Sequence, residues 1–354
     1  MERQQKLPLW TRRWSELGDP VTLSRGGGAG LEVGSTGSYQ HFIPASLIGQ
    51  FSLDTAAHAR RRSLWVARRG GHVFRTTAER VGGVHDLYTL QEPGNQNPYL
   101  IDQQWASAES KLLPALTELV HSRGRIKADT FVNLVSFVTS LFVRGLDFTD
   151  RFEERMTRKL GEGWKAITGP DNSKFARVFE RQRLYYPIMA SEWVVLHNVS
   201  RVPIVTNDLG YVAHFNPLMG HYGYAVPVNL STVLVLLRSH THLRVCWDGS
   251  EWWTTGIQHC DVGAEHVEAL NKVMAESCLH EVYGPREPAI RHLERFQSAT
   301  SSSRPPGPSL LVDPNKPLWK TEMYFCSLVS RIGKEPPPEL LPMYSCEPRS
   351  ELIT

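Results

Sequence analysis

The feature of this sequence that most constrains its fold is a change in hydrophobic period partway along the chain. Between residues 102 and 186, apolar residues recur every three or four positions, which is the spacing of amphipathic helices. From Trp193 to Thr255 this period gives way to short runs rich in β-branched and aromatic residues, which are typical of strands. Because helices and strands are grouped rather than alternating, the pattern predicts an α+β fold over a doubly wound one.

Local signals predict a small N-terminal β-hairpin region, a helical middle, a larger and mostly antiparallel sheet, and a closing helix. Gly70-Gly71 separates two short β-like runs, which is typical of a hairpin. Pro114 predicts a kink in the first long helix, and Asp129 is the expected N-cap of the second. The expected strands are 63–68, 72–76, 193–196, 203–206, 233–237, 242–247 and 251–255, and the expected helices are 102–123, 129–142, 149–160, 175–186 and 264–283.

Composition divides the chain into three parts. Residues 1–38 end in a glycine-rich run and are expected to form a flexible lead-in. That run lacks the Lys-Ser/Thr of a phosphate-binding loop. Residues 39–297 are expected to form a single α+β domain, and residues 298–354 a Ser/Pro-rich linker and C-terminal tail.

Composition also excludes several classes of protein. A hydrophobic fraction of 41% with ten Trp excludes general disorder. The net charge of +3 lacks the basic excess of most nucleic-acid binders, so a nucleic-acid partner is not indicated. No apolar stretch reaches the roughly 20 residues of a membrane helix. Five widely spaced cysteines argue against a disulfide scaffold or a zinc finger, and they predict a cytoplasmic location.

A run near the start of the expected domain resembles a known family. Residues 40–44, Gln-His-Phe-Ile-Pro, precede Ile48 and Phe51, as His-His-Tyr-Val-Pro precedes a Leu and a Phe in the bacterial domain-of-unknown-function family 4238. Further matches follow in order and extend the resemblance over residues 40–285, namely Val81-Gly82-Gly83 to Asp86-Leu87-Tyr88, Glu109, Arg144, Trp193 to Thr206-Asn207-Asp208, and Leu270-Asn271.

The chain also departs from the family pattern. Gln40 stands where the first histidine is expected, and Gly145-Leu146 stands in place of the Thr-Pro that follows the arginine. A proline expected soon after Asp208 is missing. The family has no established activity, so the resemblance implies no cofactor, metal or partner.

The resemblance and the residue types together single out His41, Glu109, Arg144 and Asp208 as candidate site residues. One interpretation is a hydrolase acting at a phosphate or carbonyl centre. In it His41 is the base, Arg144 the anion clamp, and Asp208 or Glu109 the acid or orienting group. The alternative is a non-catalytic binding or regulatory module, because structural ion networks use the same residue types. Convergence of the four around a cavity would favour the enzyme.

Two other groups carry weaker signals. His240 and His242 place two imidazoles on one face of an expected strand, and His259 is nearby in sequence on an element of uncertain type. An exposed strand face explains the pair without a metal. A tryptophan group around the expected Asp248-Gly249 turn could stack a ligand ring or pack across a hairpin. Its members are Trp247, Trp252 and Trp253.

Overall fold

The computed structural model describes residues 38–297, except 56–57, 92–96, 123, 165–170, 190, 217–220, 238–243 and 248–249. The expectations for residues 1–37 and 298–354 lie outside this part, as do those for His240, His242 and the Asp248-Gly249 turn. Helices and strands are largely segregated along the described chain, which confirms the predicted α+β class.

The strands are β1 (Tyr39–His41), β2 (Ser63–Arg68), β3 (Val73–Thr77), β4 (Gly83–His85), β5 (Arg125–Lys127), β6 (Glu192–Asn198), β7 (Thr206–Asn207), β8 (Val212–Asn216), β9 (His221–Asn229), β10 (Thr232–Leu237), β11 (Arg244–Trp247), β12 (Trp252–Thr255), β13 (Gln258–Val262) and β14 (Glu281–Gly284). The helices are α1 (Ala45–Ile48), α2 (Leu100–Ser110), α3 (Leu112–His121), α4 (Ala128–Arg144), α5 (Phe148–Leu160), α7 (Asn172–Met189), α8 (Ala264–Ser277) and α9 (Glu287–Gln297), with short 3₁₀ turns at Gly49–Phe51, Ala59–Arg61 and Ala78–Arg80.

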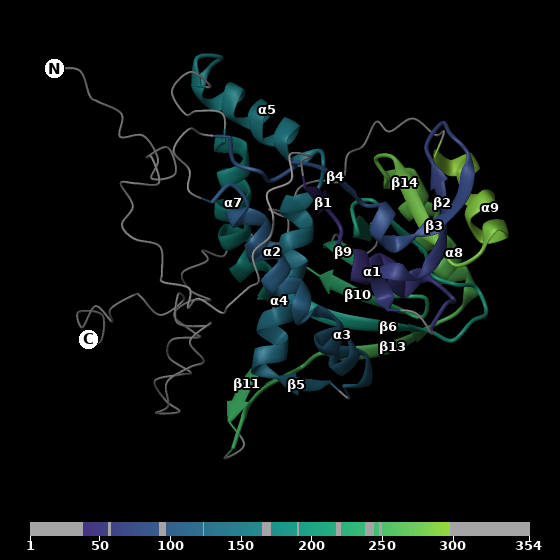
Figure 1. The fold of residues 1–354 in the computed structure, drawn as a ribbon. Helices are drawn as coiled ribbons and strands as arrows, with labels where there is room; N and C mark the ends of the chain where they lie inside the picture. Colours follow the sequence, from purple (N-terminus) through teal and green to yellow (C-terminus); the bar gives the residue numbers. More distant parts are fainter. Residues whose placement is uncertain are drawn as a thin grey trace.

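The strands form four sheets. The largest has the order β13-β6-β10-β9-β8, and its pairs are antiparallel except β13 with β6. The others have the orders β3-β2-β14-β7, β11-β12-β5 and β1-β4. Figure 1 shows α2, α4 and α7 gathered on one side of the largest sheet, while α8 and α9 accompany β2, β3 and β14 at the other end of the molecule.

Helix α4 is the centre of the core. From Phe131 onward its apolar residues are buried around most of the helix, as expected of a helix enclosed on all sides. Phe131 packs on Trp193 of β6 at a ring distance of 4.8 Å, and Phe142 lies 4.4 Å from the ring of Tyr211. Burying each such ring stabilises the fold by about 1.5–3 kcal/mol. This packing carries Arg144, the last residue of α4, into the interior.

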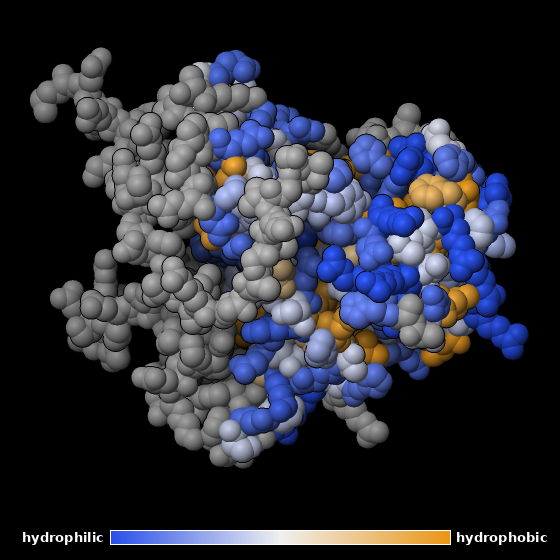
Figure 2. Space-filling view, viewed as in Figure 1, coloured by the Kyte–Doolittle hydropathy of each residue, from blue (hydrophilic) through white to orange (hydrophobic). Residues whose placement is uncertain are grey.

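The visible surface contrasts with this core. In Figure 2 it is mostly hydrophilic, and hydrophobic residues show as small separate patches. Among the described helices, none combines the length and apolarity needed to cross a membrane by itself; α4 and α5 meet the criteria only as a pair bent by 72°.

Two helix predictions need correction, one for a break inside the helix and one for its first residue. The helix expected over residues 102–123 is divided at Lys111 into α2 and α3, rather than kinked at Pro114. The break places Pro114 in the first turn of α3, where its missing N–H and its ring are tolerated. Asp129 is not an N-cap, because α4 begins at Ala128 with Lys127 before it. The Asp129 carboxylate lies in the first turn, where it interacts favourably with the helix dipole.

The closing helix shows the largest departure from prediction. It was expected to run to residue 283, but α8 ends at Ser277, and residues 281–284 form strand β14 between β2 and β7. The carboxylate of Asp208 accepts the backbone N–H groups of residues 279–281 and holds this segment extended. The other predicted strands and helices are present in the described residues, although only Thr206 of the 203–206 run lies in a strand.

Candidate functional site

Arg144 brings two of the other predicted site residues together. Its Nη1 donates to Oε1 of Glu109 on α2 at 2.6 Å, and its Nη2 donates to the main-chain oxygen of His41 on β1. Its own carbonyl accepts the hydroxyl of Tyr88 at 3.1 Å. The Arg144 side chain is fully buried, whereas that of Glu109 is 26% exposed. The arginine therefore joins β1, α2 and α4 through the interior.

The His41 ring is held in its neutral form. Its pKa is lowered to about 4: burial is the largest cause, Arg60 and Arg144 act in the same direction, and the Glu109 carboxylate acts in the opposite direction. Neutral His41 donates from Nε2 to the carbonyl oxygen of Glu79 at 3.2 Å. A general base works best when its pKa lies near the working pH, so His41 is a weak base at neutral pH.

A second buried arginine, Arg177 of α7, supports the same helix end and was missed from the sequence. Its Nη1 donates to the carbonyl oxygens of Val143 at 2.6 Å and Gly145 at 3.1 Å. The last carbonyl oxygens of a helix have no N–H donor within the helix, and Arg177 supplies a donor at this end of α4. Burial lowers the pKa of Arg177 to about 10, so it stays charged. The sequence predicted a helix over residues 175–186 but gave no sign of this buried cation.

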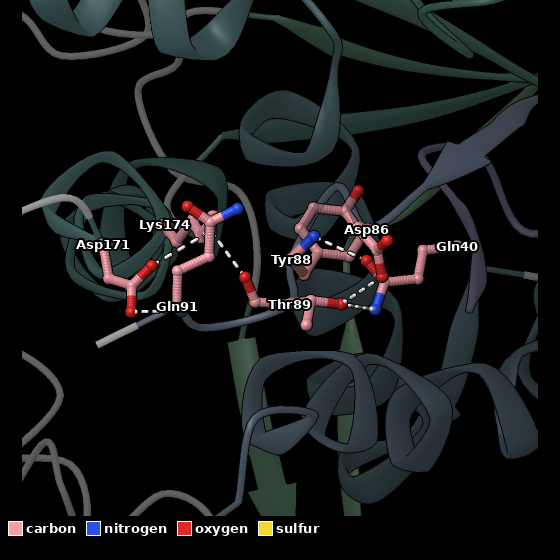
Figure 3. A network of polar contacts seen from close by, with 7 residues as sticks. All are labelled: Gln40, Asp86, Tyr88, Thr89, Gln91, Asp171 and Lys174. Carbon is pink, nitrogen blue, oxygen red and sulfur yellow. Dashed lines mark hydrogen bonds and ion pairs between the residues drawn. The ribbon is translucent and has the colours of Figure 1, made fainter. Parts of the chain in front are cut away.

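A polar network fixes the segment that presents Tyr88 to Arg144 (Figure 3). Oε1 of Gln40 accepts the N–H of Tyr88 at 2.5 Å, and its Nε2 donates to the hydroxyl of Thr89 at 3.1 Å. Further along, Asp171 accepts the N–H of Gln91 at 2.6 Å. Gln40 occupies the place of the family's first histidine. Its buried side-chain amide uses both its nitrogen and its oxygen in these two contacts, which are structural.

Asp208 lies in a different part of the structure. Its carboxylate accepts N–H groups from Leu279 at 2.8 Å, His280 at 2.5 Å and Glu281 at 3.2 Å. Its pKa is raised to about 7: burial is the largest cause, the three hydrogen bonds act to lower the pKa, and the Glu281 carboxylate acts to raise it. The neighbouring Asn207 makes an Asx turn, because its Oδ1 accepts the N–H groups of Leu209 and Gly210.

The four predicted site residues therefore do not form one cluster. His41, Glu109 and Arg144 meet, while Asp208 bonds to the start of β14. None of the four residues lines the cavity at Ser122 and His259 or either of two cavities beside α5. Arg144 and Asp208 are fully buried, and both bond to backbone groups of distant segments.

A different set of chemically capable side chains lines a surface cavity of about 470 Å³. His197 on β6 and His259 on β13 point to the same face, because β13 pairs in parallel with β6 and their positions differ by two residues in register. Their rings stack at 5.1 Å and 15°, and Nε2 of His197 lies 2.8 Å from Nδ1 of His259. The cavity is lined by Val120, His121, Ser122, Gly124, His197, Ile257 and His259.

Ser122 extends this pair into a chain of three groups. Its Oγ lies 3.1 Å from Nε2 of His259, and also 2.9 Å from the carbonyl oxygen of Leu119 in the last turn of α3. Burial lowers the pKa of His259, and so does the neighbouring His197 ring, so the neutral imidazole is favoured. With the proton on Nδ1 donated to His197, Nε2 of His259 is left as an acceptor for the serine hydroxyl.

The sequence contains few signals that point to Ser122, His197 and His259 as a group. His259 was noted only beside a possible metal pair, and Ser122 fell inside the helix expected over residues 102–123. The parallel pairing of β13 with β6 joins histidines 62 positions apart, which no local pattern predicts. A usable signal was the histidine at the end of the otherwise apolar run 193–197. Among the described residues, no three metal-ligating side chains are grouped so as to hold an ion.

Comparison with known proteins gives one match. A family model described as "Protein of unknown function (DUF4238)" matches residues 39–287, which is more than half of the chain. No curated protein and no solved structure matches.

Proposed function

The chain belongs to the DUF4238 family of proteins of unknown function, and we propose that this member is a binding module for small aliphatic carbonyl compounds. The ligand site in this proposal is the cavity at Ser122, His197 and His259, which we call the histidine cavity. In this proposal the contacts among His41, Glu109 and Arg144, and the separate contacts of Asp208 with the start of β14, stabilise the fold. A cytoplasmic location, and the bacterial origin implied by the family resemblance, belong to the same proposal; the exposed thiol of Cys260 supports the location.

The observation that carries the proposal is the contrast in what the polar groups contact. Arg144 bonds to Glu109 and to a backbone oxygen, inside the core and away from the cavities. Ser122, His197 and His259 bond to one another at the wall of a cavity that solvent reaches. A hydrolase built on His41, Glu109, Arg144 and Asp208 has less support, because that reaction needs a cavity where the four converge.

The lining suggests the chemical class of the ligand. Val120 and Ile257 provide an apolar wall for a short alkyl chain, and the serine and imidazoles offer donors and acceptors for a carbonyl group. Main chain at Gly124 also lines the cavity. Its φ of +81° favours glycine, and an added Cβ would lie 2.8 Å from the carbonyl oxygen of Ile257. An uncharged carbonyl compound fits these groups without requiring a buried ion.

Titration with acetamide, butyramide and hexanamide tests the proposal. These amides are uncharged and carry the carbonyl and alkyl parts that the cavity lining suggests. Histidine-selective NMR should show saturable shifts of the His197 and His259 resonances, with affinity rising about threefold to fourfold for each methylene buried. Exposed His266 is the internal control and should not shift. Shifts confined to His41, or no saturable shift at either cavity histidine, would overturn the proposal.

A further inference from the structure

The order of the three groups in the histidine cavity suits nucleophilic chemistry. A hydroxyl, an imidazole that accepts its proton, and a second group that orients this imidazole form the general arrangement of an activated serine. Here the distances are 3.1 Å from Ser122 to His259 and 2.8 Å from His259 to His197. Both lie within hydrogen-bonding range, and His259 uses its two ring nitrogens for different partners.

We infer that Ser122 is a nucleophile activated by His259, that His197 positions His259, and that the cavity hydrolyses short-chain carboxylic esters. This inference rests on the proposed function, since the ester must first bind in the same cavity. A binding module with these groups would be an esterase for the subset of its ligands that carry a leaving group.

The reaction balances without a metal or cofactor. Oγ of Ser122 attacks the ester carbonyl carbon and forms a C–O bond, while the hydroxyl proton passes to Nε2 of His259. The bond to the alkoxide breaks, and the alkoxide takes that proton and leaves as an alcohol. Water then attacks the acyl group and gives a proton to His259; the acyl–Oγ bond breaks, and Ser122 recovers the proton as the acid departs.

The competing contact of Ser122 does not block this step. Its hydroxyl has one hydrogen and two acceptors nearby, the Leu119 carbonyl oxygen at 2.9 Å and Nε2 of His259 at 3.1 Å. Rotation about the Cβ–Oγ bond moves the hydrogen from one to the other without moving the oxygen. With the hydrogen directed at the Leu119 carbonyl the hydroxyl is at rest, and with the hydrogen directed at His259 it is ready to lose its proton.

Hydrolysis of p-nitrophenyl butyrate and labelling by an alkyl fluorophosphonate test the inference on the full chain. In labelling, the Oγ–P bond forms as the P–F bond breaks, and mass mapping should place the adduct on Ser122. Ser122→Ala should abolish the adduct and reduce turnover to the protein-free rate. His259→Gln should slow both by at least about a hundredfold. Cys260→Ser controls for the exposed thiol next to His259 and should leave both rates unchanged.

His197 requires a readout that a purely structural role would not move. The His197 ring helps to lower the pKa of His259, so His197→Gln should shift the midpoint of the pH–rate profile to higher pH and slow turnover about tenfold. His266→Gln is the matched control, because His266 is exposed on α8 and is not among the residues that line the cavity. An unshifted profile in His197→Gln would remove the positioning role.

The outcomes separate this inference from the proposed function. Saturable butyramide binding at His197 and His259 without ester turnover or a Ser122 adduct would overturn the inference and leave the binding function standing. Turnover that survives Ser122→Ala would also overturn it. Absence of both butyramide binding and turnover would overturn the proposed function as well.

Discussion

Two regions of this protein contain a histidine with hydrogen-bonding partners, yet they differ in the groups to which their side chains bond. Around Arg144, the guanidinium bonds to a carboxylate and to backbone within the core, and the His41 ring bonds to a backbone carbonyl. At the histidine cavity, Ser122 contacts His259 as well as a backbone carbonyl, and His259 contacts His197, all beside open space. A polar group that is saturated by its own backbone stabilises a fold, while one that faces a cavity remains available to a ligand.

Loss of Arg144 should have the largest effect on stability. Arg144→Met removes the cation that neutralises Glu109 and leaves the main-chain oxygen of His41 without its donor in the interior. We expect the free energy of unfolding in urea to fall by about 3–5 kcal/mol. Arg158→Met is the control, because its ion pair with Glu154 is exposed, and it should change stability by less than about 0.5 kcal/mol. A small effect of Arg144→Met would contradict the structural role.

Asp208 should give the next largest effect, and it should depend on pH. Because the pKa of Asp208 is raised to about 7, folding favours its protonated form, so its contribution is fully present below about pH 4 and is lost as pH rises through 7. Measured as the difference from Asp208→Asn, wild-type stability should decline by roughly 2–3 kcal/mol between pH 5 and pH 8. A difference that does not vary with pH would refute this reading of Asp208.

His41 should have a smaller effect of opposite sign. Its pKa is lowered to about 4, so its contribution is present above about pH 6.5 and is lost as pH falls through 4. Relative to His41→Gln, which keeps a donor for the Glu79 carbonyl, the wild type should lose roughly 2 kcal/mol between pH 7 and pH 5. His266→Gln, at an exposed ring, serves as the control. The same pH dependence in both variants would show that His41 is not held neutral by burial.

The cavity residues should have the smallest effect on stability. Ser122→Ala removes a hydroxyl that is only partly buried, so the free energy of unfolding should change by less than about 1 kcal/mol. The urea midpoint of Ser122→Ala should therefore stay near that of the wild type, while the midpoint of Arg144→Met should fall strongly. A loss from Ser122→Ala as large as that from Arg144→Met would place Ser122 in the structural framework.

The sequence predicted the fold class but not the contacts between segments far apart in the chain, and particular residues show why. Periodicity predicted α4 and β2–β3, because their patterns are local. It placed Glu281 in a helix, whereas β14 pairs with β2 more than 200 positions earlier and depends on Asp208 for its shape. Residue types singled out Arg144 and His41 as candidate site residues, but the ion pair and backbone contacts that occupy them depend on the whole fold.

The most direct test compares butyramide binding to two single variants, His41→Gln and His259→Gln, by NMR titration with the other histidines as reporters. If the histidine cavity is the ligand site, His41→Gln keeps the saturable shift of His197, and His259→Gln weakens binding at least about tenfold. Retained binding in His259→Gln together with lost binding in a folded His41→Gln protein would contradict the assignment and return the site to the region around Arg144.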